Sequence, residues 1–164
     1  MDRSGRGLWG AVFLLGVAAI AQADDQPGAA MMKPVRELVD FMSALPRGKH
    51  ASMFASEGVC IVENFAPFLF CGPGAALAWE AGFRDHSAEE QLSGLAAQFD
   101  PAHDFTKSGN RVYFSLPTTW SGRTHGRSFE EHGAWAFVLE RRREEAWRIV
   151  GYGWGVFSYQ EAEQ

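Results

Sequence analysis

The part of the chain that follows Asp100-Pro101 constrains the fold most, because it consists largely of β-type runs. Four β-type runs cover residues 103–107, 111–120, 127–140 and 147–158, and apolar and aromatic residues make up about half or more of the last three. Short turn-forming or charged sequences separate them, at residues 108–110, 121–126 and 141–145. Connections this short join antiparallel neighbours. The sequence therefore predicts a meander of long antiparallel strands.

Helical patterns precede these strands. Apolar residues recur at helical spacing after Pro34, which predicts a helix with one buried face that ends before Pro46. A short second helix is predicted over residues 49–56 and a third over residues 73–83. Ser87 and Glu90 have the spacing of a capping box, which predicts a further helical stretch. Its apolar stripe would consist of Leu92, Leu95, Ala96 and Phe99. Helices followed by strands indicate an α+β fold in which a curved antiparallel sheet wraps around the N-terminal helices.

Two cysteines lie in two further β-type runs on either side of Ala66-Pro67. Cys60 belongs to residues 59–64 and Cys71 ends residues 68–71. A loop of residues 64–67 would place the cysteines directly opposite each other, and a two-residue turn would place them diagonally on the same face. A disulfide closing so short a loop would contribute about 2.5 to 3 kcal/mol in the chain-entropy model. The alternative is two free thiols that pack as small hydrophobic groups.

The N-terminus has the order of a secretory signal peptide. Arg3 and Arg6 precede an apolar run over residues 8–21, and Ala21-Gln22-Ala23 forms a small-x-small cleavage site. The run is shorter than the roughly 20 residues needed to span a bilayer, so we expect cleavage after Ala23 and no membrane anchor. The alternative is a short buried helix. The sequence thus predicts a signal peptide (1–23), a flexible lead (24–32) and a folded domain (33–160) in the periplasm or outside the cell.

Net charge excludes one class of partner. Cleavage would remove Arg3, Arg6 and Asp2, which leaves 13 Lys and Arg against 19 Asp and Glu, a net charge of −6. Nucleic-acid binding depends on basic side chains that neutralise phosphates. We therefore expect no nucleic-acid partner.

Both faces of the later strands carry bulky side chains. Phe114 and Leu116 alternate with Tyr113, and Trp135 and Phe137 lie in a similarly bulky run. One face is expected to pack on the helices, and the other to contact a second copy of the chain. This pattern predicts a homodimer, which light scattering after size exclusion would show as a mass twice that of the chain.

The order of motifs resembles the nuclear transport factor 2-like superfamily, and within it the SnoaL-like and ketosteroid-isomerase-like domains. The resemblance covers about residues 35–159 and rests on five features in order. These are two helices, the strand that enters Asn64-Phe65-Ala66-Pro67-Phe68, the helix start Gly72-Pro73-Gly74-Ala75, Trp79 within that helix, and long strands that close on Trp147-Arg148-Ile149-Val150 and Trp154. It implies a cone-shaped α+β fold that encloses an apolar cavity for a hydrophobic small molecule.

The resemblance also implies positions for the chemistry. Asn64 stands where ketosteroid isomerases have their aspartate base, and an amide cannot abstract a proton. Phe41 and Ala134 or Ala136 stand at the two oxyanion positions, so steroid isomerisation is excluded. Trp154 matches a tryptophan that lines such pockets. Together with the aromatic content of the strands, this identifies the candidate ligand contacts as Phe41, Asn64, Tyr113 and Trp154.

Glu130 and His132 are candidate catalytic residues, because they lie two apart on one strand and so share a face with Ala134 and Ala136. The resemblance implies that this face lines the pocket. A carboxylate beside a histidine would raise the basicity of the imidazole. The alternative is a solvated pair at the rim.

The other titratable residues have less specific interpretations. His103 and Asp104 should point to opposite faces, and His50, His86 and His125 read as solvated. Glu63 should face away from Asn64 and pair with an arginine of a later strand. No spacing indicates a metal site or a cofactor.

Two functions therefore follow from the sequence. The favoured one is a non-catalytic exported domain that binds a small hydrophobic ligand or a partner protein. The alternative is a SnoaL-like acid–base enzyme, an isomerase, cyclase or hydratase, that acts on a small hydrophobic substrate through His132 and Glu130.

Overall fold

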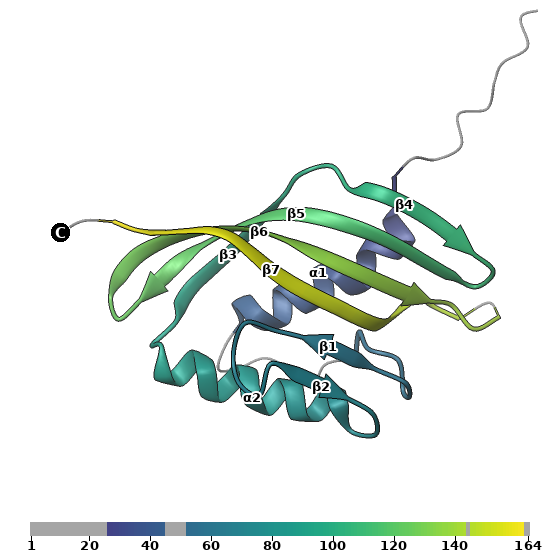
Figure 1. Ribbon diagram of the computed structural model, residues 1–164, viewed down its shortest axis with the longest axis horizontal. Coiled ribbons are helices and arrows are strands. Elements are labelled where there is room, and N and C mark those ends of the chain that lie inside the picture. Colours follow the sequence, from purple (N-terminus) through teal and green to yellow (C-terminus); the bar gives the residue numbers. More distant parts are fainter. Residues whose placement is uncertain (1–25, 45–51, 144, 163–164) are drawn as a thin grey trace, which may run out of the picture.

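A curved seven-stranded sheet organises the chain in the computed structural model, which describes residues 26–44, 52–143 and 145–162 (Figure 1). Its centre is formed by three long antiparallel strands. They are β5 (Arg111–Thr124), β6 (Arg127–Glu140) and β7 (Arg148–Glu161). Shorter strands flank them in the order β2-β1-β7-β6-β5-β3, with β4 also paired to β5. The short strands are β1 (Cys60–Val62), β2 (Leu69–Cys71), β3 (Ser93–Phe99) and β4 (His103–Ser108).

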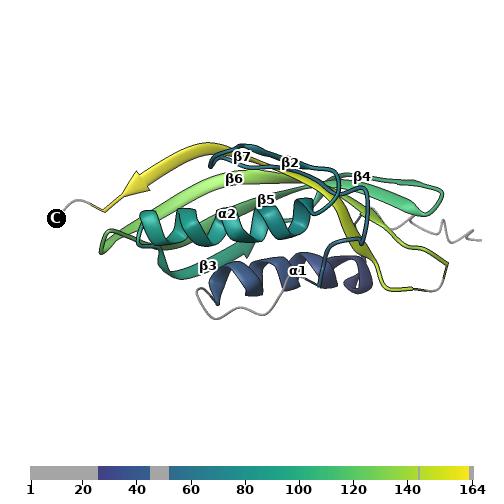
Figure 2. The same cartoon turned by 90° about the horizontal axis from the view of Figure 1, so that it is seen from below.

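Two helices lie under the arch of this sheet, α1 (Ala29–Ser43) and α2 (Ala75–Glu89) (Figure 2). The α+β class and the curved sheet predicted from the sequence are confirmed. The sheet is mixed rather than purely antiparallel, because β1 runs parallel to β7. Within the described ranges, neither helix is long and apolar enough to cross a membrane.

The first helical segments differ from the prediction. α1 begins at Ala29, so Pro34 lies inside the helix and costs it one backbone hydrogen bond. Burial of apolar side chains on both sides of Pro34, such as Met32 and Val35, offsets this loss. The second predicted helix is wrong where the structure describes it: residues 52–56 are not helical, and Phe54 bridges to Ile149 beside the sheet.

The segment after α2 was also predicted wrongly. α2 continues to Glu89, and the Ser87 hydroxyl donates to the Phe83 carbonyl (2.7 Å) in the last turn instead of capping a new helix. The backbone then turns through positive φ at Gln91, just after the helix end, and again at Gly94 near the start of β3. Residues 93–99 form β3, whose exposed and partly buried positions alternate with the period of a strand.

The cysteines of β1 and β2 are joined by a disulfide. Cys60 lies directly opposite Cys71 in the antiparallel register, and the Glu63 amide donates to the Phe68 carbonyl (3.0 Å). The hydrogen bond between Glu63 and Phe68 closes a loop of residues 64–67. A loop of this length was predicted to place the two cysteines directly opposite each other. The bond ties β2 to β1, next to the parallel contact of β1 with β7.

An aromatic core fills the space between the helices and the sheet. Trp79 of α2 is fully buried, and its ring packs against Phe41 of α1, Phe83 of α2 and Tyr152 of β7. On β6 the inward side chains include Trp135 and Phe137, both almost completely buried. Because the larger rings take the inner face, they fix which residues of each strand point toward the helices.

The outer face of the sheet is nearly flat at β7, where Gly151, Gly153 and Gly155 alternate with inward side chains. Tyr113 of β5 is exposed on this outer face. Homodimerisation through it stays a prediction. The predicted signal peptide and its cleavage site lie outside the described residues. In the predicted lead, residues 24 and 25 also lie outside them, and residues 29–32 already belong to α1.

Candidate functional site

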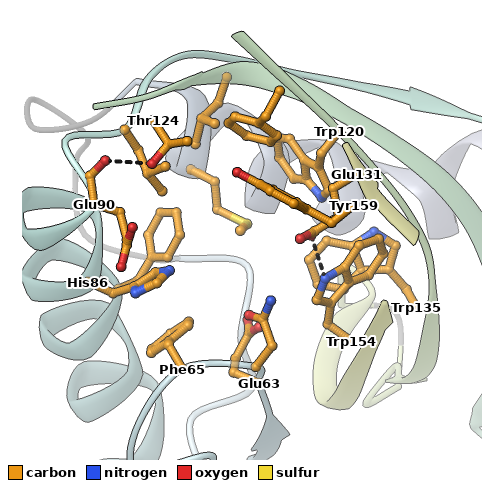
Figure 3. A pocket seen from close by; sticks show the side chains of 16 residues that line it. Glu63, Phe65, His86, Glu90, Trp120, Thr124, Glu131, Trp135, Trp154 and Tyr159 are labelled. Carbon is orange, nitrogen blue, oxygen red and sulfur yellow. Dashed lines mark hydrogen bonds between the residues drawn. The ribbon is translucent and has the colours of Figure 1, made fainter. Parts of the chain in front are cut away.

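A cavity of about 240 Å³ lies between α2, the loop after β1 and the inner face of the long strands (Figure 3). Seven of its sixteen lining side chains are aromatic, so most of its wall is apolar. The aromatic residues are Phe65, Phe83, Trp120, Phe129, Trp135, Trp154 and Tyr159. The aliphatic residues are Met42, Leu92 and Leu95, and the polar residues are Glu63, Asn64, His86, Glu90, Thr124 and Glu131.

Glu63, which follows β1, is a buried carboxyl group at this wall. One of its oxygens accepts hydrogen bonds from the indole N–H of Trp79 (3.0 Å) and from the hydroxyl of Tyr152. Burial raises the pKa of Glu63 to about 7, although these donors partly counteract the shift. The predicted ion pair with a later-strand arginine is therefore wrong, because the parallel pairing of β1 with β7 places the carboxyl beside Tyr152.

Glu131 of β6 is the second carboxyl group at the cavity. Its neighbours across the sheet are Trp120 of β5 and Tyr159 of β7, and all three line the cavity. A carboxylate oxygen of Glu131 accepts a hydrogen bond from the indole N–H of Trp154 (3.0 Å). Burial raises the pKa of Glu131.

Gly133, two residues along β6, makes room for the Trp154 ring. A β-carbon at this position would lie 2.5 Å from the ring atoms of Trp154 and from the Gly155 carbonyl. The absence of a side chain at Gly133 therefore allows the indole to lie where it meets Glu131.

His86 faces these groups from the other wall, on the last turn of α2 (Figure 3). Its ring stacks on Phe65 at a centroid distance of 5.0 Å. Burial lowers the pKa of His86, although the nearby Glu90 and Glu89 partly counteract the shift, so the imidazole is mainly neutral near pH 7. The prediction that His86 is solvated is wrong, because the loop that carries Phe65 covers the helix end.

Two of the four predicted ligand contacts line the cavity. Asn64 and Trp154 do so, whereas Phe41 is buried in the core behind it, between Trp79 and Phe83. Tyr113 lies on the outer face of the sheet. Phe41 and Tyr113 are thus placed away from the cavity.

The predicted catalytic pair lies on the face opposite to the one expected. Glu130 and His132 hydrogen-bond to each other (2.8 Å) on the outer side of β6, where His132 also contacts the Thr119 hydroxyl (3.0 Å). Trp135 and Glu131 take the inner side, so the face of Ala134 and Ala136 is not the pocket face. The large aromatic residues at alternate positions of β6 could have shown which of its side chains point to the inner face.

The remaining histidines stay outside the cavity or outside the described residues. His103 and Asp104 are exposed on β4, and His125 pairs with Glu90 (3.3 Å). His50 lies outside the described residues. Within residues 26–44, 52–143 and 145–162, no three His, Cys, Asp or Glu side chains gather in an arrangement that could hold a metal ion.

An open curved sheet over helices, with a cavity on the concave side, is the nuclear transport factor 2-like or SnoaL-like fold. The solved structures that share it with this chain include the following three. A type 2 hexachlorocyclohexane dehydrochlorinase, LinA, matches 82% of this chain and 88% of its own at 12% identity, with a TM-score of 0.66. An NTF2-like superfamily protein from Salmonella enterica serovar Typhimurium matches 76% and 87% at 12% identity, with a TM-score of 0.62. A scytalone dehydratase-like protein from Novosphingobium aromaticivorans matches 82% and 87% at 6% identity, with a TM-score of 0.59.

The likeness at these identities establishes the fold. No family model matches the chain, and no curated protein matches it.

Proposed function

We propose that this protein binds a small, mostly apolar molecule in the cavity between α2 and the sheet. The observation that carries the proposal is the wall itself, in which seven aromatic side chains surround a few convergent polar groups. This combination is typical of small-molecule sites. Among the solved structures that share the fold, LinA and the scytalone dehydratase-like protein are named for reactions of small molecules, which supports a small-molecule ligand here.

Native mass spectrometry of the purified protein tests this proposal. We expect a retained small molecule at one per chain, or uptake of one added aromatic probe such as 4-tert-butylphenol. Leu95→Trp should abolish retention and uptake, because Leu95 lines the cavity and the larger ring fills it. Leu77→Trp is the matched control, because Leu77 is 63% exposed on α2. Equal binding by the two variants would place the ligand elsewhere, and no binding by the parent protein would contradict the proposal.

A second candidate function is acid–base catalysis, and it is favoured by one observation. A neutral imidazole, His86, and carboxyl groups with raised pKa, Glu63 and Glu131, line opposite walls of the same cavity. His86 would take a proton from a carbon next to a carbonyl group, and a protonated carboxyl would donate its proton to the carbonyl oxygen, giving an enol. In this candidate reaction, the base that takes the proton is therefore His86 rather than His132.

Hydrogen–deuterium exchange tests that candidate without knowledge of the natural substrate. In D₂O, the protein should accelerate exchange at the acidic carbon of 2-tetralone, as followed by proton NMR. His86→Gln should lower the protein-dependent rate about 100-fold or more, because a positioned base contributes roughly that factor. His132→Gln should leave it unchanged. If His86→Gln retains the full rate, His86 is not the base.

We further propose that residues 1–23 direct export and are removed, and that the mature protein forms a homodimer. The order of positive, apolar and small residues supports export, and the intact mass of the exported protein would report cleavage after Ala23. The small residues on the outer face of β7 and the exposed Tyr113 supply a surface for a second copy.

A further inference from the structure

Two carboxyl groups of the cavity, Glu63 and Glu131, have only neutral side chains as hydrogen-bond donors among the described residues. Glu63 is 5% exposed, and its hydrogen-bond donors are the neutral side chains of Trp79 and Tyr152. Glu131 has the neutral indole of Trp154 as its donor. Among the described residues, no lysine or arginine lines the cavity, and the third carboxyl group, Glu90, lies 3.3 Å from the imidazole of His125. Within this part of the chain, the cavity therefore has two carboxyl groups without matching positive charge.

Aromatic rings surround these carboxyl groups. Trp120 and Tyr159 lie beside Glu131 on the neighbouring strands, and Trp154 hydrogen-bonds to it. Figure 3 shows Phe65 facing them from the opposite wall. The face of an aromatic ring attracts a cation, and this attraction grows when the cation is removed from water. Rings and carboxyl groups together are thus complementary to an organic cation.

We infer that the ligand of this cavity is a small hydrophobic ammonium compound, held by the aromatic rings and by the carboxylates of Glu63 and Glu131. This inference rests on the proposed function and specifies its ligand class. Burial raises the pKa of both carboxyl groups, which is the expected consequence of carboxyl groups that have no counter-charge in the empty cavity. A bound ammonium group would supply that charge, whereas an anionic ligand would meet unfavourable charge on several sides.

Three probes of nearly the same shape separate charge from shape. They are (4-hydroxyphenyl)trimethylammonium, the neutral 4-tert-butylphenol and the anion 4-hydroxybenzenesulfonate. Titration calorimetry of the unmodified protein should show the ammonium compound binding about tenfold or more tightly than the neutral one, with the anion weakest.

Glu131→Gln should remove most of the preference for the ammonium compound and leave the affinity for 4-tert-butylphenol within about twofold, because glutamine keeps an acceptor for Trp154 and loses the charge. Glu130→Gln is the matched control, since the neighbouring residue points to the outer face. If Glu131→Gln does not fold, the comparison of the three probes on the parent protein still tests whether the cavity prefers an ammonium compound.

The outcomes separate the inference from the proposed function. Equal or tighter binding of 4-tert-butylphenol by the parent protein would overturn the ammonium ligand and leave the binding function standing. A preference for the ammonium compound that survives Glu131→Gln and Glu63→Gln would also overturn the role of these carboxylates. Binding of none of the three probes, in a protein that carries no ligand by native mass spectrometry, would overturn both.

Discussion

Replacing Trp79 with alanine is expected to lower the free energy of unfolding by about 4 kcal/mol, within the range of roughly 3 to 5 kcal/mol typical of a buried tryptophan. Trp79 is fully buried at the centre of the aromatic core, with centroid distances of 5.5 Å to Phe41 and 5.7 Å to Phe83. The substitution also removes an N–H donor from the buried carboxyl of Glu63. Both the cavity left by the ring and the lost hydrogen bond destabilise the fold.

Urea unfolding measured by fluorescence checks this value. Trp79→Phe keeps an aromatic ring and removes only part of the volume and the donor, so we expect a smaller loss, about half of that for alanine. Phe157→Ala is the surface control, because Phe157 is 74% exposed, and it should change the free energy by no more than about 0.5 kcal/mol. A loss below about 1.5 kcal/mol for Trp79→Ala would show that this ring is not central to the core.

The contribution of Glu63 to the stability of the protein is expected to fall as the pH rises from about 4.5 to about 7. Burial raises the pKa of Glu63 from 4.5 to about 7, so in this window the folded state keeps a proton that the unfolded state has released. The folded state therefore binds more protons at this group, and the contribution of Glu63 to the free energy of unfolding decreases by about 3 kcal/mol across the window. Below pH 4.5 both states are protonated at this group, and above pH 7 both are ionised.

Chemical unfolding at a series of pH values, compared with Glu63→Gln, isolates this contribution. Glutamine does not titrate, so the difference in stability between the parent and the variant should change with pH between 4.5 and 7 and level off on both sides. The raised pKa of Glu131 adds a slope of the same sign to both proteins, and most of it cancels in the difference. A difference that stays constant with pH would mean that Glu63 is ionised in the folded state throughout.

The sequence predicted the long strands because their signal is local. Residues 111–120, 127–140 and 147–158 are rich in aromatic and β-branched residues and lie between short turns, and the structure has β5, β6 and β7 at these places. The direct opposition of Cys60 and Cys71 was one of two registers that the loop length left open. Residues 92–99 were assigned to a helix because an apolar spacing of three or four residues also fits alternate positions of a strand when the run is short.

The cavity could be predicted only in part, because it depends on contacts between distant segments. Glu63 and Tyr152 meet through the parallel pairing of β1 and β7, which no local pattern indicates. His86 lines the cavity because the end of α2 packs against the loop that carries Phe65. The resemblance was used to assign the face of Ala134 and Ala136 to the pocket. The large side chains of β6, such as Trp135, indicated that the other face of the strand points inward.

The central claim is that small molecules occupy the aromatic cavity between α2 and the sheet. Fluorine NMR of protein labelled with 5-fluorotryptophan, with each resonance assigned through a Trp→Phe variant, tests it during titration with 4-tert-butylphenol and its ammonium analogue. We expect saturable shifts at Trp120, Trp135 and Trp154, which line the cavity, and none at Trp147, which lies beside Arg141 away from it. Shifts at Trp147 with none at the three cavity tryptophans would contradict the claim.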